Sequence, residues 1–121
     1  MNIYLEMMNQ WLILKQEGKS IARYLERNGF RSVAVYGMGI YGRHAVRDLQ
    51  GTGVSVVYGL DRKKMKPYLG VEILQPTGEL PQADVIINSV LHDHMDIKAA
   101  LSQVTDIPVV SLEDVVFGSY E

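Results

Sequence analysis

Three glycines in the spacing G-x-G-x-x-G, Gly37, Gly39 and Gly42, are the residues of this sequence best suited to chemistry. They follow an apolar run of strand type and precede a helical pattern, which is the context in which this spacing binds the diphosphate of a dinucleotide. The first glycine permits a tight turn, the second lets a phosphate approach backbone that has no Cβ, and the third lets the helix pack close to the sheet. Amide N–H groups at the start of that helix then face the phosphates.

An acidic residue stands where the adenosine ribose of such a ligand lies. Asp61 ends the second apolar run, about 20 residues after the glycines, and a carboxylate there accepts hydrogen bonds from ribose hydroxyls. The same carboxylate repels a 2′-phosphate, whereas Arg62 attracts one, and we expect NAD, with NADP as the second choice. With two polar residues after a later apolar run, the predicted cofactor-binding set is Gly37, Met38, Gly39, Ile40, Tyr41, Gly42, Asp61, Arg62, Asn88 and Ser89.

Two histidines and two aspartates lie together in His92-Asp93-His94-Met95-Asp96. No other cluster supplies the remaining ligands of a metal site, and Asp93 with Asp96 fits an N-cap followed by an acid in the first helical turn. We therefore expect helix capping and no metal. Histidine suits general acid–base catalysis near neutral pH, and His92 or His44 is placed for it, but neither has an identifiable partner. The catalytic residues stay unassigned.

Alternating strand and helix patterns position these residues. We expect strands over residues 32–36, 54–60, 71–74, 84–90 and 108–110, and helices over 40–50, 94–103 and 112–117, with 62–70 as a loop. The alternation predicts an α/β protein with a shortened Rossmann fold, a five-stranded parallel sheet in the order 3-2-1-4-5. Ligands bind such sheets beyond the carboxyl ends of the strands, where the glycines, Asp61 and residues 88–93 would meet.

Residues 1–30 are expected to form a helical hairpin, before a nucleotide-binding domain over residues 31–121. Ser20 is the predicted N-cap of the second helix, and Asn28-Gly29-Phe30 its predicted Schellman end. Because the hairpin cannot bury its own apolar face, it must pack on the sheet or on a second copy, and we expect a homodimer through these helices. The first helix, over residues 3–16, has an apolar stripe of Tyr4, Leu5, Met8, Trp11 and Leu12, widened by Met7 and Leu14.

The composition of the chain argues against several classes of function. The chain has 121 residues, 47% of them hydrophobic and 21% charged, with a net charge of −2, which provides no electrostatic basis for binding nucleic acid or an anionic membrane. Cysteine is absent, which excludes disulfides and thiolate metal sites. No apolar run approaches the roughly 20 residues that span a bilayer. Because the N-terminus has no basic region typical of a signal peptide, we expect a cytoplasmic protein.

Five segments carry a resemblance to a known group of proteins: residues 19–25, 33–43, 57–61, 84–87 and 110–115. They resemble small Rossmann-like domains of bacterial polysaccharide and sugar-nucleotide proteins, which occur alone or fused to glycosyltransferase, methyltransferase or acyltransferase modules. They also resemble the nucleotide-binding first domain of sugar-nucleotide dehydratases. The resemblance implies an NAD(P)-binding fold with a role near cell-surface sugar metabolism. Dehydratases add a large catalytic portion with a tyrosine–lysine pair, which this chain lacks.

The sequence therefore favours a dinucleotide-binding domain without a complete active site, accessory to sugar-nucleotide or polysaccharide metabolism and acting with a partner enzyme. An enzymatic role would be that of an NAD(P)-dependent oxidoreductase or a sugar-nucleotide-modifying enzyme. It would require a site completed by oligomerisation, with Tyr41, Asn88 or His92 of one copy meeting the hairpin of another. Two alternatives stay open, a ligand-free scaffold for protein interactions and a binder of another adenine ligand such as coenzyme A or a nucleotide sugar.

Overall fold

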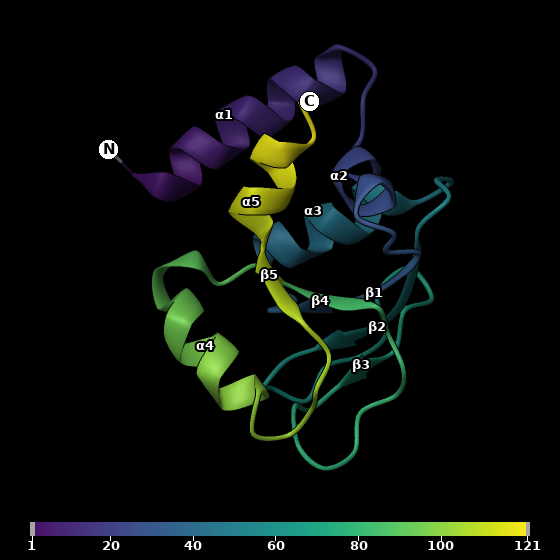
Figure 1. Cartoon of the computed structure of the whole chain (residues 1–121), viewed down its shortest axis with the longest axis vertical. Coiled ribbons are helices and arrows are strands. Elements are labelled where there is room, and N and C mark those ends of the chain that lie inside the picture. The colour runs from purple at the N-terminus through teal and green to yellow at the C-terminus, as the bar shows by residue number, and fades with distance from the viewer. Residues whose placement is uncertain (1, 121) are drawn as a thin grey trace.

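The fold is built on a five-stranded, all-parallel sheet in the order β3-β2-β1-β4-β5 (Figure 1), which confirms the predicted topology. The computed structural model describes residues 2–120. The third strand is shorter than predicted because Val71 forms an antiparallel bridge with Tyr68 instead of joining the sheet. The strands are β1 (Ser32–Tyr36), β2 (Ser55–Leu60), β3 (Ile73–Leu74), β4 (Val85–Asn88) and β5 (Val109–Ser111).

Helices cover the two faces of the sheet unequally. One face carries α1, α2, α3 and α5, with α1 lying across α5, and the other face carries α4 (Figure 1). Residues 62–70 contain no helix, as predicted. No helix within residues 2–120 has the length and apolarity to cross a bilayer. The helices are α1 (Ile3–Gln16), α2 (Ala22–Arg27), α3 (Ile40–Leu49), α4 (His94–Leu101), which follows a short 3-10 turn η1 (Leu91–Asp93), and α5 (Leu112–Gly118).

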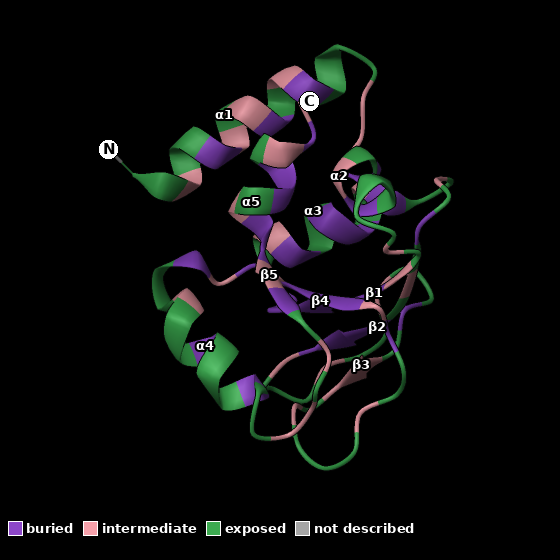
Figure 2. Ribbon diagram, in the orientation of Figure 1, coloured by how far each residue is buried: buried purple, intermediate pink, exposed green. Residues whose placement is uncertain are grey.

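The central strands are buried on both faces (Figure 2). Successive side chains of a strand point to opposite faces, so Val33 and Val35 pack on the side of α3 while Ala34 and Tyr36 pack on the side of α4. The first half of β2 departs from this pattern, because the pairing of β1 with β2 skips Val57, which is 42% exposed. The first half of β2, residues 55–57, is therefore exposed or only half-buried.

Local capping explains where several elements begin and end. Ser111 caps α5 by accepting a hydrogen bond from the amide of Asp114. The N-cap of α2 is Ile21 and not Ser20 as predicted, although the Oγ of Ser20 accepts a hydrogen bond from the amide of Ala22, the first residue of that helix. Gly29 has a positive φ of 75°, and the amide of Phe30 donates to the carbonyl of Leu25, which is the predicted Schellman end.

Asp93 does not cap the helix that follows it. It precedes α4, but its side chain makes no capping hydrogen bond and instead contacts Nε2 of His92 at 3.3 Å. Asp93 is at the N-cap position and Asp96 is the acid in the first turn, as predicted, but the capping hydrogen bond is absent.

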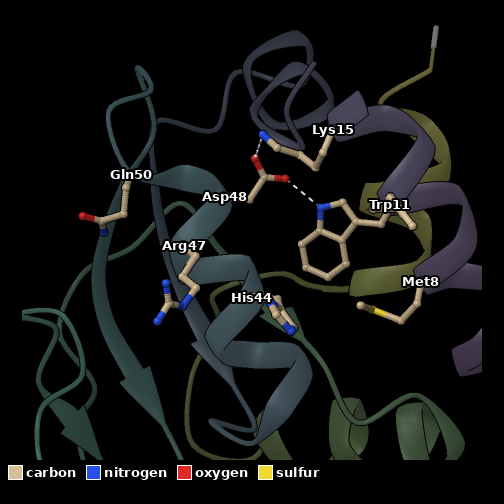
Figure 3. A pocket seen from close by; sticks show the side chains of 8 residues that line it. Met8, Trp11, Lys15, His44, Arg47, Asp48 and Gln50 are labelled. Carbon is tan, nitrogen blue, oxygen red and sulfur yellow. Dashed lines mark hydrogen bonds and ion pairs between the residues drawn. The ribbon is translucent and has the colours of Figure 1, made fainter. Parts of the chain in front are cut away.

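The buried face of α1 is centred on Met7, Trp11 and Leu14. Two members of the predicted stripe face solvent instead, Leu5 at 66% and Leu12 at 58% exposed. The cause lies in α3, where the Asp48 carboxylate accepts hydrogen bonds from Trp11 Nε1 at 2.7 Å and Lys15 Nζ at 2.6 Å (Figure 3). An indole N–H that leaves water needs such a partner, and this contact goes with burial of the side of α1 that carries Met7 and Leu14.

Asp48 also accepts a hydrogen bond from the amide of Ile21, which immediately precedes α2. Its side chain is only 3% exposed. One carboxylate thus fastens α1 and the start of α2 to α3. Trp11 and Met7, expected as a buried stripe, are buried within their own chain, and dimerisation through these helices stays a prediction.

We expect Asp48→Ala to lower the free energy of unfolding by about 1–3 kcal/mol, because it leaves a buried indole N–H without a partner. The change should cost less in a Trp11→Phe background, where that N–H is already gone, and urea unfolding of the four proteins of this cycle measures the difference. An equal cost in both backgrounds would contradict the proposed contact.

Asp84 connects the start of β4 to the start of β1. Its carboxylate accepts hydrogen bonds from the amides of Arg31 at 2.8 Å and Ser32 at 3.0 Å, and these backbone donors lower the pKa of Asp84 from its ordinary 3.8. A lowered pKa in the folded state stabilises the protein above the ordinary value, and this stabilisation is lost as the pH falls through the lower value.

We therefore expect Asp84→Asn to be less stable than the natural chain near neutral pH, with the difference shrinking as the pH falls below the ordinary pKa of 3.8. Denaturant unfolding near neutral pH and below this value measures it. A stability difference that does not change with pH would show that the carboxylate charge is not what the two amides stabilise.

Candidate functional site

The turn after β1 is held in place from both neighbouring strands. The amide of Gly37 donates to the carbonyl of Leu60 in β2 at 2.8 Å. On the other side, the hydroxyl of Ser89 lies 2.9 Å from the carbonyl of Tyr36 and 2.6 Å from that of Gly37. The glycine turn is therefore a rigid part of the sheet edge rather than a loose loop.

Two of the three glycines are required by the fold itself. Gly37 has a φ of 86°, and a Cβ there would lie 2.5 Å from Ser89 Oγ. A Cβ on Gly42 would lie 2.0 Å from the carbonyl oxygen of Gly37, so α3 can approach the turn only with glycine at this position. These are the roles that the sequence predicts for the first and third glycines.

Gly39 is different because a side chain there would not collide with the chain. Its φ is −83° and its ψ is −148°, and a Cβ there would meet no atom within 4 Å. Gly39 is the residue before α3, which begins without a capping side chain. The backbone of Gly39 is thus accessible to a ligand. It lies beside the first amides of α3, which have no partner within the helix.

Asp61 reaches the same turn from the end of β2. One carboxylate oxygen accepts a hydrogen bond from the amide of Met38 at 2.9 Å, and the other accepts from the amide of Lys63 at 2.9 Å. Each oxygen keeps a second lone pair for another donor. The acid is therefore pre-positioned at the turn and is still able to bind a hydroxyl group.

The remaining predicted residues divide into buried and accessible ones. Met38 is fully buried and packs beside Gly59, so it offers the site only its backbone. Ile40 is 69% exposed at the start of α3, Tyr41 is half-buried, and Arg62 is exposed. Arg62 follows Asp61, and it lines the cavities of this edge described below.

Asn88 and Ser89 face inward. Both are almost fully buried, and Asn88 bonds through its side chain to the backbone of Val90 and to Nδ1 of His94 at 3.0 Å. Their polar atoms are engaged in shaping the turn and the loop after β4. Asn88 and Ser89 therefore lie at the carboxyl edge of the sheet, as predicted, but they are buried beneath the surface that a ligand would contact.

Two adjoining cavities open at the carboxyl edge of the sheet, on the side of β2. The first, of about 410 Å³, lies between the turn, Asp61 and the start of α4, and the second, of about 290 Å³, lies between residues 75–77 and α4. Both are in the size range of small-molecule sites. The first is lined by Tyr36, Gly37, Asp61, Arg62, Lys63, Val90, Asp93, Asp96 and Ile97. The second is lined by Tyr36, Arg62, Gln75, Pro76, Thr77, Ile97, Ala100 and Leu101.

A third cavity, also of about 410 Å³, lies between α1 and α3 on another side of the molecule (Figure 3). Trp11, Lys15 and Asp48 form part of its wall through the hydrogen bonds described above. Sequence reasoning did not identify Asp48. The only available signal was a tryptophan in a predicted buried stripe, whose N–H must find an acceptor.

His44 and His92, the histidines considered for acid–base catalysis, both contact other side chains. His44 lies edge-on to the ring of Trp11, away from the glycine turn, and His92 contacts Tyr4 and Asp93. No group of three or more histidine, cysteine, aspartate or glutamate residues within residues 2–120 is arranged to hold a metal ion.

Comparison with protein-family models, with curated proteins and with solved structures finds no match to this chain.

Alanine substitution separates the three glycines. We expect Gly42→Ala and Gly37→Ala to lower the free energy of unfolding by about 1–3 kcal/mol, because the new Cβ collides with the Gly37 carbonyl in the first variant and with the Ser89 and Val90 side chains in the second. Gly39→Ala should stay within about 0.5 kcal/mol of the natural chain. Chemical denaturation measures all three. A Gly39→Ala variant as unstable as Gly42→Ala would show that the middle glycine is also structural.

Proposed function

We propose that this protein binds a nucleotide through its adenosine diphosphate group, at the carboxyl edge of the sheet between the glycine turn and α4. The observation that carries the proposal is Gly39, the one glycine of the motif at which an added Cβ would meet no atom of the chain. A phosphate that must approach the backbone at this point accounts for it. The parallel sheet, with its reversal of strand order between β1 and β4, is the architecture in which ligands bind at this place.

Each part of the nucleotide has a matching environment. The diphosphate meets the uncapped amides at the start of α3, where the helix dipole favours negative charge. The ribose hydroxyls donate to Asp61, which the amides of Met38 and Lys63 hold in position. The adenine occupies the space against Ile97 and Leu101 of α4, which is the more apolar wall of the edge cavities.

Asp61 selects among adenine ligands. A 2′- or 3′-phosphate on the ribose brings a second negative charge to the carboxylate, so ADP and NAD are favoured over NADP and coenzyme A. The expected association with sugar-nucleotide metabolism belongs to the same proposal. It rests on the sequence resemblance alone.

A scaffold for protein interactions is the second candidate. The exposed Leu5 and Leu12 lie on α1, and Leu12 also borders the cavity between α1 and α3, so an apolar strip faces outward. This strip is where a homodimer or a partner enzyme would dock. The ligand experiment that follows decides between the two candidates.

Thermal unfolding in the presence of ADP, NAD, NADP, coenzyme A and UDP-glucose tests the proposal. ADP at a hundred times its dissociation constant should add about 2.7 kcal/mol of stability, which raises the melting temperature by several degrees. Calorimetric titration should then show Asp61→Ala weakening ADP at least tenfold, since hydrogen bonds to a charged acceptor contribute about 1.5–3 kcal/mol.

Asp96→Ala is the matched control, because Asp96 lines the same cavity from α4 without contacting the turn. It should bind ADP at least as tightly as the natural chain, since it removes a negative charge near the diphosphate. If no nucleotide shifts the unfolding of the natural chain, the binding proposal fails and the scaffold becomes the better account.

A further inference from the structure

Tyr4, near the start of α1, lies across the crevice between the two loops that meet where the strand order reverses. Its ring stacks on that of Tyr41 in the first turn of α3, with centroids 4.6 Å apart and an interplanar angle of 21°. Its hydroxyl accepts a hydrogen bond from the amide of Leu91 at 2.9 Å and lies 2.8 Å from Nδ1 of His92, both in the loop after β4. Figure 1 shows the beginning of α1 on the same side of the molecule as this loop.

The contacts of Tyr4 divide the crevice into an open and a closed side. The cavities on the side of β2 reach Asp61 and α4 but not Tyr41, Leu91 or His92. A dinucleotide lies across the whole crevice, with its diphosphate at the helix start. If Asp61 binds the adenosine ribose, the second nucleoside must continue past the diphosphate to the far side, between Tyr41 and the loop after β4. Tyr4 already fills that space.

We propose that the site takes a single nucleoside diphosphate, and that Tyr4 excludes the second nucleoside of a dinucleotide. This inference rests on the proposed nucleotide site and narrows its ligand class from NAD to ADP or an ADP whose terminal phosphate carries a small group. NAD must either displace Tyr4 from the Tyr41 ring and the Leu91 amide or leave its second nucleoside in solvent.

The geometry also gives the first helix a role at the site. Tyr4 contacts both loops of the crevice, one through its ring and the other through its hydroxyl. The amide of Leu91 would otherwise need another acceptor, so the hydroxyl stabilises the closed arrangement. Asn2 caps the same end of α1 by accepting hydrogen bonds from the amides of Tyr4 and Leu5. This cap fixes where α1 begins and therefore where the Tyr4 side chain leaves the helix.

The test is calorimetric titration of ADP and NAD into the natural chain and into Tyr4→Ala. The natural chain should bind ADP at least tenfold more tightly than NAD. Tyr4→Ala should tighten NAD binding at least tenfold and change ADP binding less than threefold, so that the two affinities converge. Tyr4→Phe keeps the stacked ring but loses the hydroxyl, and it should keep most of the preference for ADP.

Leu5→Ala is the control, because Leu5 neighbours Tyr4 on the exposed side of α1 and should change neither affinity. Far-ultraviolet circular dichroism shows whether each variant remains folded, and an unfolded Tyr4→Ala leaves Tyr4→Leu to carry the same comparison. Equal affinities for ADP and NAD in the natural chain, or a preference for ADP that Tyr4→Ala does not change, would overturn the role of Tyr4 and leave the adenosine site intact. Absence of ADP binding would instead overturn the proposed function itself.

Discussion

The close approach of α3 to the turn after β1 is the contact on which the rest of this structure depends. The helix can begin where it does only because Gly42 brings no side chain against the carbonyl of Gly37. That carbonyl is held by Ser89, and the next amide along the chain, that of Met38, donates to Asp61. Three strands therefore converge on one turn, and contacts with this turn position the helix start and the acid.

Asp48 is a second centre of contacts, and it influences the shape of the crevice beside the glycine turn. By binding Trp11 and Lys15 it fixes the rotation of α1, and that rotation sets where the helix's first turn lies. Tyr4 then reaches Tyr41 and the loop after β4. The buried carboxylate in the last turn of α3 and the aromatic contact in its first turn thus couple the packing of the N-terminal helices to the shape of the crevice.

Much of the fold could be predicted from local patterns. Apolar runs separated by helical segments specified the strand order, and the spacing of Gly37, Gly39 and Gly42 located the turn, because these signals depend on neighbours in the chain. The buried face of α1 could not be predicted in this way, since apolar residues surround much of that helix and the choice between Leu12 and Leu14 is made by Asp48, far away in sequence. Asn88 and Ser89 were placed at the correct edge, but polarity alone does not say whether a side chain turns inward. The contact of Tyr4 with Tyr41 could not be predicted either, because no sequence pattern relates these two residues.

The central claim is that the glycine turn is a binding surface for an adenosine diphosphate group, with Gly39 kept free for it. Amide chemical shifts of ¹⁵N-labelled protein during titration with ADP test this most directly, because they report each backbone position separately. The account predicts the largest changes at Gly39, Ile40 and Tyr41, with smaller ones at Asp61 and Ile97. Changes confined to the cavity beside Trp11, or none at saturating ADP, would contradict it.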